Sequence, residues 1–340
     1  MPDEVKISAI VSTYASEEFM AECLDDLVGQ TAADQLEIVV VDACSPQGEG
    51  EIVARYQERF PRINYIRTPE RIGIYAAWNV AIKAARGKYL TPFSTNDRLA
   101  PDAYEVLGRY LDEHPDVDLV YGDTHLTDLP HQTFESFSPS VGDEGPAWQW
   151  PPFSYFDLLV RCSVGPHPMW RKEVHGPVGL FDESFKSVGD QDFWLRLGRA
   201  HVLRNIPHFT GLYWREEAAL SNQEGAYKEL ARLRMSYVPA YLKSRDFGEC
   251  NAIRDKVLGS FERGELAQAI IAFKCELEEC LLSASCKLSE QIMLLTERGR
   301  LAQAHGLYLA SRPKLPDFPE LAELDALMKR VAGQLGKQQH

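Results

Sequence analysis

Residues 37–45 read EIVVVDACS, and this stretch decides the fold. Residues Glu37–Val41 make a nearly continuous apolar run of strand length. Runs of this kind are typical of strands that are buried on both faces of a parallel sheet. Asp42 follows directly, so its carboxylate is expected at the carboxyl end of the strand, where such sheets bind their ligands. A second run of the same kind, Lys6–Ser12 (KISAIVS), precedes it in the chain.

Strand-like and helix-like segments alternate around these two runs as far as about residue 125. Between the runs, apolar residues recur at the three-to-four spacing that gives a helix one buried face. Residues 74–86 also have helical character, and Gly87 is placed to end that helix in the left-handed conformation. Repeated strand–helix units predict a doubly wound α/β sheet with right-handed crossovers. Further strands are expected at 63–67, 88–93 and 117–121, and a further helix after Pro101.

The length and charge of the chain limit the function classes. At roughly one domain per 100–200 residues, the 340 residues predict two or three domains. The formal net charge of -14 argues against nucleic-acid binding and against docking on anionic lipid through a basic patch. The sequence has no apolar run of about 18 residues, and its acidic first residues (MPDE) lead us to expect no signal peptide. We therefore expect a cytoplasmic protein, with a peripheral position at the inner face of the membrane as the alternative.

The cysteines are odd in number and lack paired C-x-x-C spacing, so we expect free thiols in a reducing compartment. A metal cluster at Cys275, Cys280 and Cys286 is the alternative, and helical packing of small apolar side chains is favoured over it. The seven are Cys23, Cys44, Cys162, Cys250, Cys275, Cys280 and Cys286.

The chain changes character twice after the alternating region. Residues 128–154 are rich in Pro, Ser, Gly and aromatic residues, as expected of a long surface loop near a site. After about residue 222 the pattern is almost wholly helical. There, ERGELAQA at 262–269 recurs as ERGRLAQA at 297–304, an offset of 35 residues that is close to the tetratricopeptide period. An accidental echo within a helical bundle is the alternative to a true repeat.

The charge distribution favours a boundary at residue 222. Residues 1–222 hold 19 Lys and Arg against 34 Asp and Glu, whereas residues 223–340 hold 17 against 16. We therefore expect a catalytic domain at 1–222 and a helical extension at 223–340. A tetratricopeptide-like fold is one interpretation of this extension. Within the first domain, a nucleotide-binding half is expected at about 1–125 and an acceptor half at about 126–222.

Four segments in order resemble the inverting glycosyltransferases of family 2, which have the GT-A fold. The resemblance covers about residues 5–220 and implies a Rossmann-like mixed sheet flanked by helices, followed here by an all-α extension. The first segment stands where the family has Pro-Thr-Tyr-Asn, and the second where it has Val-Val-Asp-Asp-Gly-Ser. The segments are Ile10–Tyr14 (IVSTY), Val40–Ser45 (VVDACS), the stretch from Gly73 to Leu99 with Ala77-Trp78-Asn79 and Ser94–Leu99 (STNDRL), and Gly189–Leu197 (GDQDFWLRL).

The resemblance implies a donor site for a nucleoside diphosphate sugar at the strand ends. The Ser12 hydroxyl, the Tyr14 ring and the Asp42 carboxylate are suited to contact a base and a ribose. As alternatives, Tyr14 is a buried aromatic residue and Asp42 caps a turn. Ala43 replaces the second Asp of the family motif. Arg215 follows a strand-like Tyr213-Trp214 and is expected to pair with phosphate. The expected donor-site residues are Ser12, Tyr14, Asp42, Asn79, Ser94 and Arg215.

The same resemblance implies Mn²⁺ or Mg²⁺ on an Asp-x-Asp motif, because a hard dication prefers carboxylate oxygens and neutralises the diphosphate. Here Ser94 and Asn96 occupy the two Asp positions, and Asp97 follows. We expect Asn96 and Asp97 as the metal ligands. As alternatives, Asp97 caps the start of a helix or forms an ion pair with Arg98.

The family's general base is the Asp of a Glu-Asp pair, and this position matches Asp190, with Gly189 in place of Glu. Inversion needs one carboxylate opposite the leaving group to take the proton of the acceptor hydroxyl. His167, Trp170 and Asp192 are expected on the acceptor side, where Trp170 would stack on a sugar face. For each acid the alternative is a capping role at a helix start.

These observations predict an inverting glycosyltransferase that moves a sugar from a nucleoside diphosphate to a hydroxyl of a glycan or lipid-linked glycan. A catalytically impaired GT-A protein with a binding or scaffolding role is the alternative, because Ala43, Ser94, Asn96 and Gly189 depart from the family pattern. A protein partner or a second copy is expected on the helical extension. The sequence contains no phosphate-loop, H-E-x-x-H or G-x-S-x-G motif.

Overall fold

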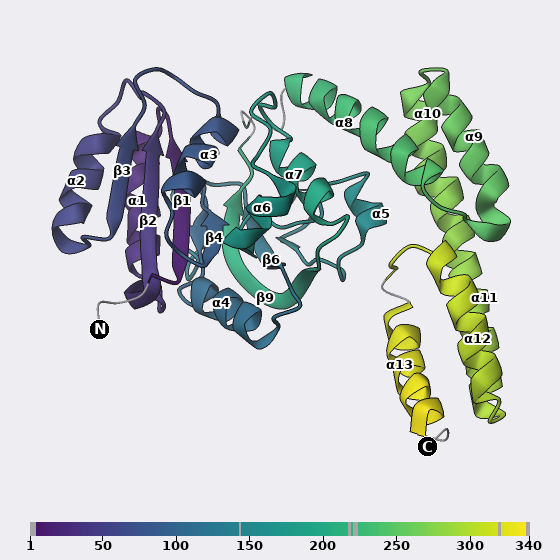
Figure 1. Cartoon of the computed structure of the whole chain (residues 1–340). Helices are drawn as coiled ribbons and strands as arrows, with labels where there is room; N and C mark the ends of the chain where they lie inside the picture. Colours follow the sequence, from purple (N-terminus) through teal and green to yellow (C-terminus); the bar gives the residue numbers. More distant parts are fainter. Residues whose placement is uncertain (1–4, 143, 217–218, 220–223, 319–320, 338–340) are drawn as a thin grey trace. The chain divides into compact units, whose positions relative to one another are not determined.

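Figure 1 shows the computed structural model of the chain, which describes residues 5–142, 144–216, 219, 224–318 and 321–337. The chain divides into two compact units. The first consists of Met1–Pro151 and Ser163–Glu229, and the second of Pro152–Cys162 and Leu230–His340. The chain therefore passes between the units three times, at 151/152, 162/163 and 229/230. The boundary expected at 222/223 lies outside the described residues.

The amino-terminal half of the first unit is a parallel sheet, as the apolar runs predict. Its strands lie in the order β3-β2-β1-β4, and every neighbouring pair is parallel. All seven residues of β2 are buried, which explains why its sequence is mostly apolar rather than alternating. The strands are β1 (Ile7–Thr13), β2 (Leu36–Asp42), β3 (Ile63–Arg67) and β4 (Tyr89–Pro92).

The sheet continues beyond β4 with mixed strand directions. Strand β8 (Met169–Arg171) pairs antiparallel with β4 and with β6 (Leu119–Thr127). Strand β9 (Leu203–Trp214) then pairs parallel with β6 and antiparallel with β5 (Arg98–Leu99). The two-residue β7 (Ala147–Trp148) pairs with β6 on its other side. The expected mixed sheet with a Rossmann-like start is thus confirmed.

Helices cover this sheet (Figure 1). The helix predicted at 74–86 ends earlier, at Ala84, and Gly87 does not have a left-handed backbone. Gly87 is required for a different reason: a Cβ there would lie 2.7 Å from the backbone nitrogen of Ser8. The helices are α1 (Glu17–Val28), α2 (Glu49–Arg59), α3 (Ile74–Ala84), α4 (Ala103–Glu113), α6 (His175–Val178) and α7 (Gly189–Leu197).

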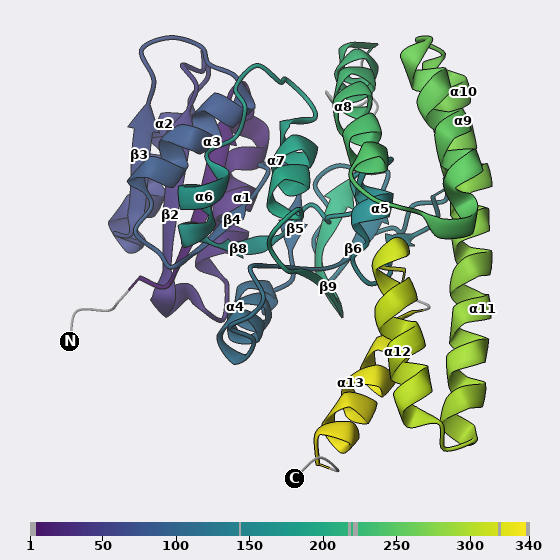
Figure 2. The same cartoon turned by 45° about the vertical axis from the view of Figure 1, so that its right-hand side comes forward.

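The second unit is helical, as predicted for the extension, and Figure 2 gives a turned view of it. Helix α12 contacts both α11 and α13. Within the described residues, no helix is both long and apolar enough to cross a membrane. The elements are α8 (Glu224–Lys243), which begins in the first unit, α9 (Asn251–Glu262), α10 (Leu266–Ile271), a π-helical turn at Ala272–Leu277, α11 (Glu278–Glu297), α12 (Leu301–Ser311) and α13 (Ala322–Lys337).

The two copies of the repeated octapeptide form the same corner between helices. Gly264 and Gly299 both have a left-handed backbone, with φ of 77° and 68°. Ala269 and Ala304 are both fully buried, so each corner places its small residue in the same kind of environment. The copies therefore repeat a helix–turn–helix unit, α9–α10 and then α11–α12, which argues against an accidental echo.

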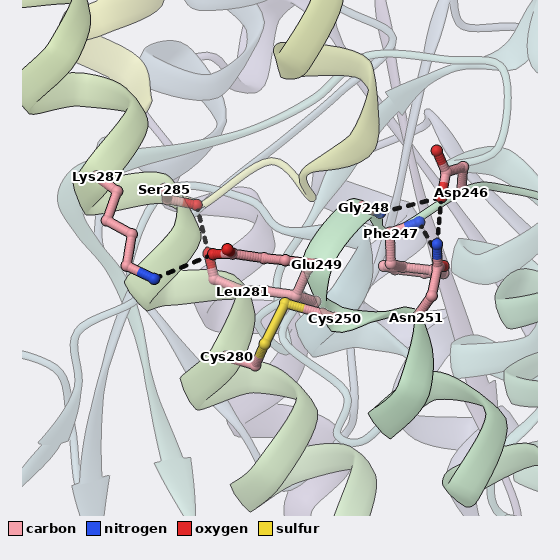
Figure 3. The surroundings of a disulfide bond; sticks show 10 residues. All are labelled: Asp246, Phe247, Gly248, Glu249, Cys250, Asn251, Cys280, Leu281, Ser285 and Lys287. Atoms are coloured by element: carbon pink, nitrogen blue, oxygen red, sulfur yellow. Dashed lines mark hydrogen bonds and ion pairs between the residues drawn. A yellow bond between two sulfur atoms is a disulfide. The ribbon is translucent and has the colours of Figure 1, made fainter.

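The expectation that all seven cysteines are free thiols is wrong. Cys250 and Cys280 form a disulfide, with 6.0 Å between their Cα atoms (Figure 3). Cys250 precedes α9 and Cys280 lies in α11, so the turn after α9 is needed to bring them together. A separation of 30 residues carries no motif, and sequence spacing alone could not indicate the pair. Cys275 and Cys286 are exposed free thiols.

The segment Pro152–Cys162 belongs to the helical unit, although both neighbouring segments belong to the first unit. It contains the short helix α5 (Tyr155–Leu158). Phe156 is buried and stacks on Phe273 of the π-helical turn, with 4.3 Å between ring centroids. The guanidinium of Arg234 in α8 donates a hydrogen bond to the carbonyl of Val160.

Candidate active site

Asp42 ends β2 and is fully buried at the centre of a bonded cluster. Its Oδ1 accepts a hydrogen bond from the backbone N–H of Ser45 at 2.6 Å. Its Oδ2 accepts one from the Tyr65 hydroxyl at 2.5 Å and forms an ion pair with Arg67. Both partners come from β3, the parallel neighbour of β2. Asp42 thus combines a turn-capping bond with a charged cluster at the carboxyl edge of the sheet, where ligands of such sheets bind.

The loops after β1 and β2 keep the backbone path that the family motifs require. Ala15 and Cys44 have left-handed φ angles of 53° and 60°. The family has Asn and Gly at these two positions, and these are the residue types that adopt this conformation most readily. The buried Glu49 ties the loops together, because its Oε1 accepts hydrogen bonds from the Ser45 hydroxyl at 2.8 Å and from Ser16 N–H at 2.9 Å.

Tyr14 follows β1 and is partly exposed, so it is not the buried aromatic of the alternative interpretation. The guanidinium of Arg71 lies 4.0 Å from the centre of its ring. Arg71 is exposed and has no carboxylate partner among the described residues. Ser12 is partly exposed as well and lies beside Val41 of β2 in the strand register. These side chains combine an aromatic face, a cation and a hydroxyl at one strand end.

The segment that replaces Asp-x-Asp offers one carboxylate, and that carboxylate is buried. Ser94 is exposed and Asn96 partly exposed, whereas Asp97 is only 2% exposed. The Oδ2 atom of Asp97 lies 3.6 Å from Nε2 of His167. His167 is also buried, and its ring lies so close to Gly211 that a Cβ there would come within 2.4 Å of it. Asp97 therefore faces the protein interior rather than its two neutral neighbours.

Asp97 does not form the ion pair with Arg98 that we gave as an alternative. Arg98 instead contacts two acids of α1, with 2.8 Å to Glu22 and 2.8 Å to Asp26. Burial raises the pKa of the Asp26 carboxyl above its usual range, and the Arg98 charge opposes this effect. Arg98 thus has a structural role next to the candidate site.

Asp190 lies in the first turn of α7 with a partly exposed side chain. Its Oδ1 accepts a hydrogen bond from the Tyr75 hydroxyl at 3.1 Å. Burial raises the pKa of the Asp190 carboxyl, and the hydrogen bonds it accepts, including the one from Tyr75, act in the opposite direction. A carboxylate in such a setting is a better proton acceptor than one in water, because its conjugate acid is stabilised.

Gly189, which stands in place of the family's Glu, is explained by Tyr75. A Cβ at Gly189 would lie 2.7 Å from the Tyr75 ring, so a side chain there would displace the tyrosine. Tyr75 is buried between Trp78 and Phe181, which lie 5.5 and 5.9 Å from it between ring centroids. Tyr75 therefore occupies the space that a glutamate side chain at position 189 would need. Sequence analysis missed Tyr75, whose position at the start of α3 gave no signal.

Two further predicted residues lie in the interior and bond within the protein. Asp192 is 7% exposed and pairs with Arg196 of the same helix at 2.9 Å. Asn79 is buried and binds the backbone of Phe181 with both ends of its amide, at 2.9 and 3.0 Å. Their roles in substrate binding remain predictions. The geometry itself shows Asn79 joining α3 to the segment before α7.

Trp170 does not have the exposure that stacking on a sugar requires. It is fully buried in β8, and its Nε1–H donates to Nε2 of His175 at 3.0 Å. Its ring contacts Trp194 and Phe193 of α7, with centroid distances of 5.3 and 6.3 Å. The aromatic character that suggested a sugar platform instead reflects the core beneath α7.

Arg215 follows β9 and is engaged by Asp128. Its Nε and one terminal nitrogen both donate to Oδ1 of Asp128, at 3.0 and 2.6 Å. Gly142 provides the space, since a Cβ there would lie 2.2 Å from the guanidinium. The pairing of Arg215 with phosphate remains a prediction. To bind phosphate, Arg215 would have to give up its ion pair with Asp128.

Comparison with known proteins identifies the first unit. The family model described as glycosyl transferase family 2 matches residues 8–153. Residues 8–153 are therefore similar to the glycosyltransferases of family 2. The match includes the ends of β1 and β2 and the Ser94–Asp97 segment.

Curated relatives match between half and two thirds of this chain. The uncharacterized glycosyltransferase MJ1057 of Methanocaldococcus jannaschii is 25% identical over 195 residues, which are 57% of this chain and 65% of that protein. Glycosyltransferase GlyA of Streptococcus pneumoniae is 34% identical over 206 residues, which are 59% of this chain and 25% of that protein. The chain thus spans less than two thirds of either relative.

Solved structures confirm the GT-A fold. The crystal structure of residues 1–349 of TarS from S. aureus has a TM-score of 0.53 and 21% identity, and the match covers 89% of this chain and 83% of that one. TarS 1–349 has also been solved in complex with UDP-GlcNAc.

Proposed function

We propose that this chain is an inverting glycosyltransferase that moves a sugar from a nucleoside diphosphate to a hydroxyl group of a glycan. The observation that carries the proposal is Asp190, a partly exposed carboxylate of raised pKa at the start of α7. Carboxylates with a shifted pKa cluster at functional sites, where a proton acceptor needs a pKa closer to the working pH. The binding-only alternative is not favoured by the retained Asp190 and Asp42.

In the proposed reaction, Asp190 accepts the proton of the acceptor hydroxyl while that oxygen attacks the anomeric carbon. The bond from this carbon to the diphosphate oxygen breaks, and its electron pair leaves with the nucleoside diphosphate. Attack opposite the leaving group inverts the anomeric configuration. The hydrogen bond from Tyr75 to Oδ1 holds the carboxylate in one orientation at the start of α7. A positioned general base of this kind contributes about 10²–10⁴-fold to a rate.

The donor base and ribose are proposed to bind at the ends of β1 and β2. Tyr14 offers a partly exposed ring, and the exposed Arg71 beside it offers the positive charge that an acidic unit needs for a diphosphate sugar. Asp42 holds Tyr65 and Arg67 in place at the same edge. UDP-GlcNAc, the sugar nucleotide of the TarS complex, is the first donor to test.

The residues at the Asp-x-Asp position fit a dication poorly. Ser94 and Asn96 are neutral oxygen donors, and the carboxylate of Asp97 is buried against His167. Among the residues that the structure describes, no group of three His, Cys, Asp or Glu side chains could hold a metal ion. Since Mn²⁺ and Mg²⁺ prefer several carboxylate oxygens, we assign no step of the reaction to a metal.

The test is the release of UDP from UDP-sugars by the purified full chain, with water as the acceptor. Wild-type protein is expected to bind UDP in calorimetry and to release it from at least one member of a panel of UDP-glucose, UDP-galactose and UDP-GlcNAc. Asp190→Asn should bind UDP but release it at least a hundredfold more slowly. Asp192→Asn is the matched control, because Asp192 lies in the same helix and pairs with Arg196.

Two results would contradict the proposal. Unchanged UDP release by Asp190→Asn would remove Asp190 from the base role. Absence of binding to UDP, GDP and dTDP would favour the binding or scaffolding alternative instead. With an acceptor in hand, the anomeric configuration of the product, read by nuclear magnetic resonance, decides between inversion and retention.

A further inference from the structure

We infer that Trp148, Trp150 and Tyr213 form a sugar-binding platform for the acceptor glycan, with Thr124 and the Trp150 indole N–H at its polar end. The inference rests on the proposed function in one respect, namely that the bound glycan is the acceptor. None of these residues belongs to the donor edge or to the surroundings of Asp190 described above.

The strand register places two of the three rings, those of Trp148 and Tyr213, on one face of the sheet. Trp148 of β7 pairs with Thr124 of β6, and Thr124 pairs on its other side with Gly211 of β9. Tyr213 is two residues beyond Gly211, so it points to the same face as Thr124 and Trp148. Gly211 has no side chain on this face, and the ring of His167 lies against it.

The rings contact each other and remain partly exposed. The centroid of Trp148 lies 5.0 Å from that of Tyr213 and 5.7 Å from that of Trp150. The indole N–H of Trp148 donates to Glu144 at 3.1 Å, which fixes the orientation of its ring. Tyr121, which is fully buried, lies 6.5 Å from Trp150 and supports it from the core. A fixed, partly exposed aromatic surface suits the apolar C–H face of a pyranose ring.

Two buried polar atoms meet at the inner end of this surface. Within the described part of the chain, neither Nε1 of Trp150 nor the hydroxyl of the fully buried Thr124 has a hydrogen-bond partner. Both face Gly165, because a Cβ built there would lie 3.1 Å from the former and 3.7 Å from the latter. Buried donors and acceptors are almost always paired in proteins, so an N–H and a hydroxyl left together indicate a polar ligand.

The two observations specify one class of ligand. An apolar face next to an N–H donor and a hydroxyl matches a sugar ring, which presents C–H groups on its face and hydroxyls at its edge. A purely apolar ligand would leave Nε1 of Trp150 and the Thr124 hydroxyl unpaired. A nucleotide has a base that stacks on aromatic rings, but its phosphates would meet Glu144 beside Trp148. The geometry therefore favours a neutral carbohydrate.

The test measures glycan binding by the full chain without donor. Saturation-transfer magnetic resonance is recorded on pentasaccharides of β-linked glucose, galactose and N-acetylglucosamine. Wild-type protein is expected to bind at least one of them, with transfer strongest to ring C–H protons. Trp148→Ala should weaken its affinity at least tenfold, while Trp148→Phe should stay within about threefold because it keeps a ring.

Two further variants separate the platform from general damage. Gly165→Ala is expected to weaken binding about fivefold without removing a ring, because its methyl group would lie 3.1 Å from Nε1 of Trp150. Phe137→Ala is the matched control. Phe137 is a partly exposed aromatic that contacts His125, and His125 follows Thr124 in β6 and so points to the opposite face. Thermal unfolding of each variant checks that it is folded.

The outcomes distinguish this inference from the proposed function. The platform is overturned if no pentasaccharide binds wild-type protein, or if folded Trp148→Ala and Gly165→Ala both bind as wild type does. The proposed function is judged separately, by UDP binding and UDP release of the wild-type protein. Glycan binding that depends on Trp148 in a protein that neither binds nor turns over nucleotide would keep the platform and remove its role as an acceptor site.

Discussion

Two aspartates of the first unit, Asp42 and Asp190, sit at the starts of loops or helices in opposite electrostatic surroundings. Asp42 at the end of β2 is fully buried and contacts the cation Arg67. Asp190 at the start of α7 accepts its side-chain hydrogen bond from the neutral Tyr75, and burial raises its pKa. The difference teaches how one residue type serves two tasks. A paired carboxylate holds geometry, whereas a carboxylate without a cation beside it can take up a proton.

The largest expected effect comes from removing the proton acceptor. Asp190→Asn keeps the shape of the side chain but cannot accept the acceptor proton, so kcat should fall about 10³-fold while UDP affinity stays within about threefold. Steady-state kinetics with the identified donor and calorimetry with UDP measure the two quantities. Asp192→Asn should reduce kcat less than tenfold. Equal losses in the two variants would contradict the contrast between these neighbouring acids.

The same variant has a consequence for stability. A carboxyl group whose pKa is higher in the folded than in the unfolded protein binds its proton more tightly when folded. Stability from this group is therefore fully present at low pH and is lost as pH rises through its titration. Asp190→Asn should be more stable than the wild type at pH 8, and this advantage should shrink toward pH 4. Thermal unfolding at a series of pH values measures it.

The next effect concerns the paired carboxylate. Asp42→Asn removes the charge that holds Arg67, and its amide would present an N–H to a guanidinium. We expect UDP affinity to fall about tenfold, with kcat changing less than affinity. Calorimetry with UDP is the measurement. Arg67→Gln is the partner variant, and a double variant no weaker than either single one would show that the two residues act as a unit.

A smaller effect is expected from Tyr75→Phe. The Tyr75 hydroxyl lowers the raised pKa of Asp190, so its removal should raise that pKa further. Because the base works in its deprotonated form, the acid limb of the kcat/KM profile should move to higher pH, and the rate on that limb should fall about threefold. A pH–rate profile tests this. A profile that does not move would separate Tyr75 from the titration of Asp190.

The smallest effect is expected from metal removal. Since the carboxylate of Asp97 is buried against His167, the donor edge should depend little on a dication. Treatment with a chelator should change UDP affinity and turnover less than about threefold, and added Mn²⁺ should not restore more than this. A hundredfold loss of turnover on chelation would show that a metal binds at the donor edge. The charge of that metal would then belong to the electrostatic surroundings of the site.

Sequence reasoning reached the parallel sheet and the strand-end positions because both follow from local rules. The apolar run before Asp42 determines a buried strand, and a strand end determines an edge. The same rule applied to β3 would have indicated Arg67, which ends that strand. The disulfide Cys250–Cys280 and the Tyr75–Gly189 contact could not be predicted, because each depends on how distant elements pack.

Trp170 shows the opposite limit. Its residue type suggested a sugar platform, but exposure is a property of packing, and the strand β8 places it in the core. Trp148 and Trp150 carry the same chemical character on a partly exposed face. Residue type alone therefore indicates which residues are able to bind a sugar, and the fold decides which of them are able to reach one.

The chain crosses from one unit to the other three times, and this affects whether the two units can be separated. Phe156 packs on Phe273 of the helical unit, although the sequence on both sides of Pro152–Cys162 belongs to the first unit. A gene cut at residue 229 would therefore leave an apolar segment without its partners in the middle of the remaining domain. Exchange of the helical unit between relatives would require a matched replacement of residues 152–162, so the two pieces are expected to be inherited together rather than shuffled end to end.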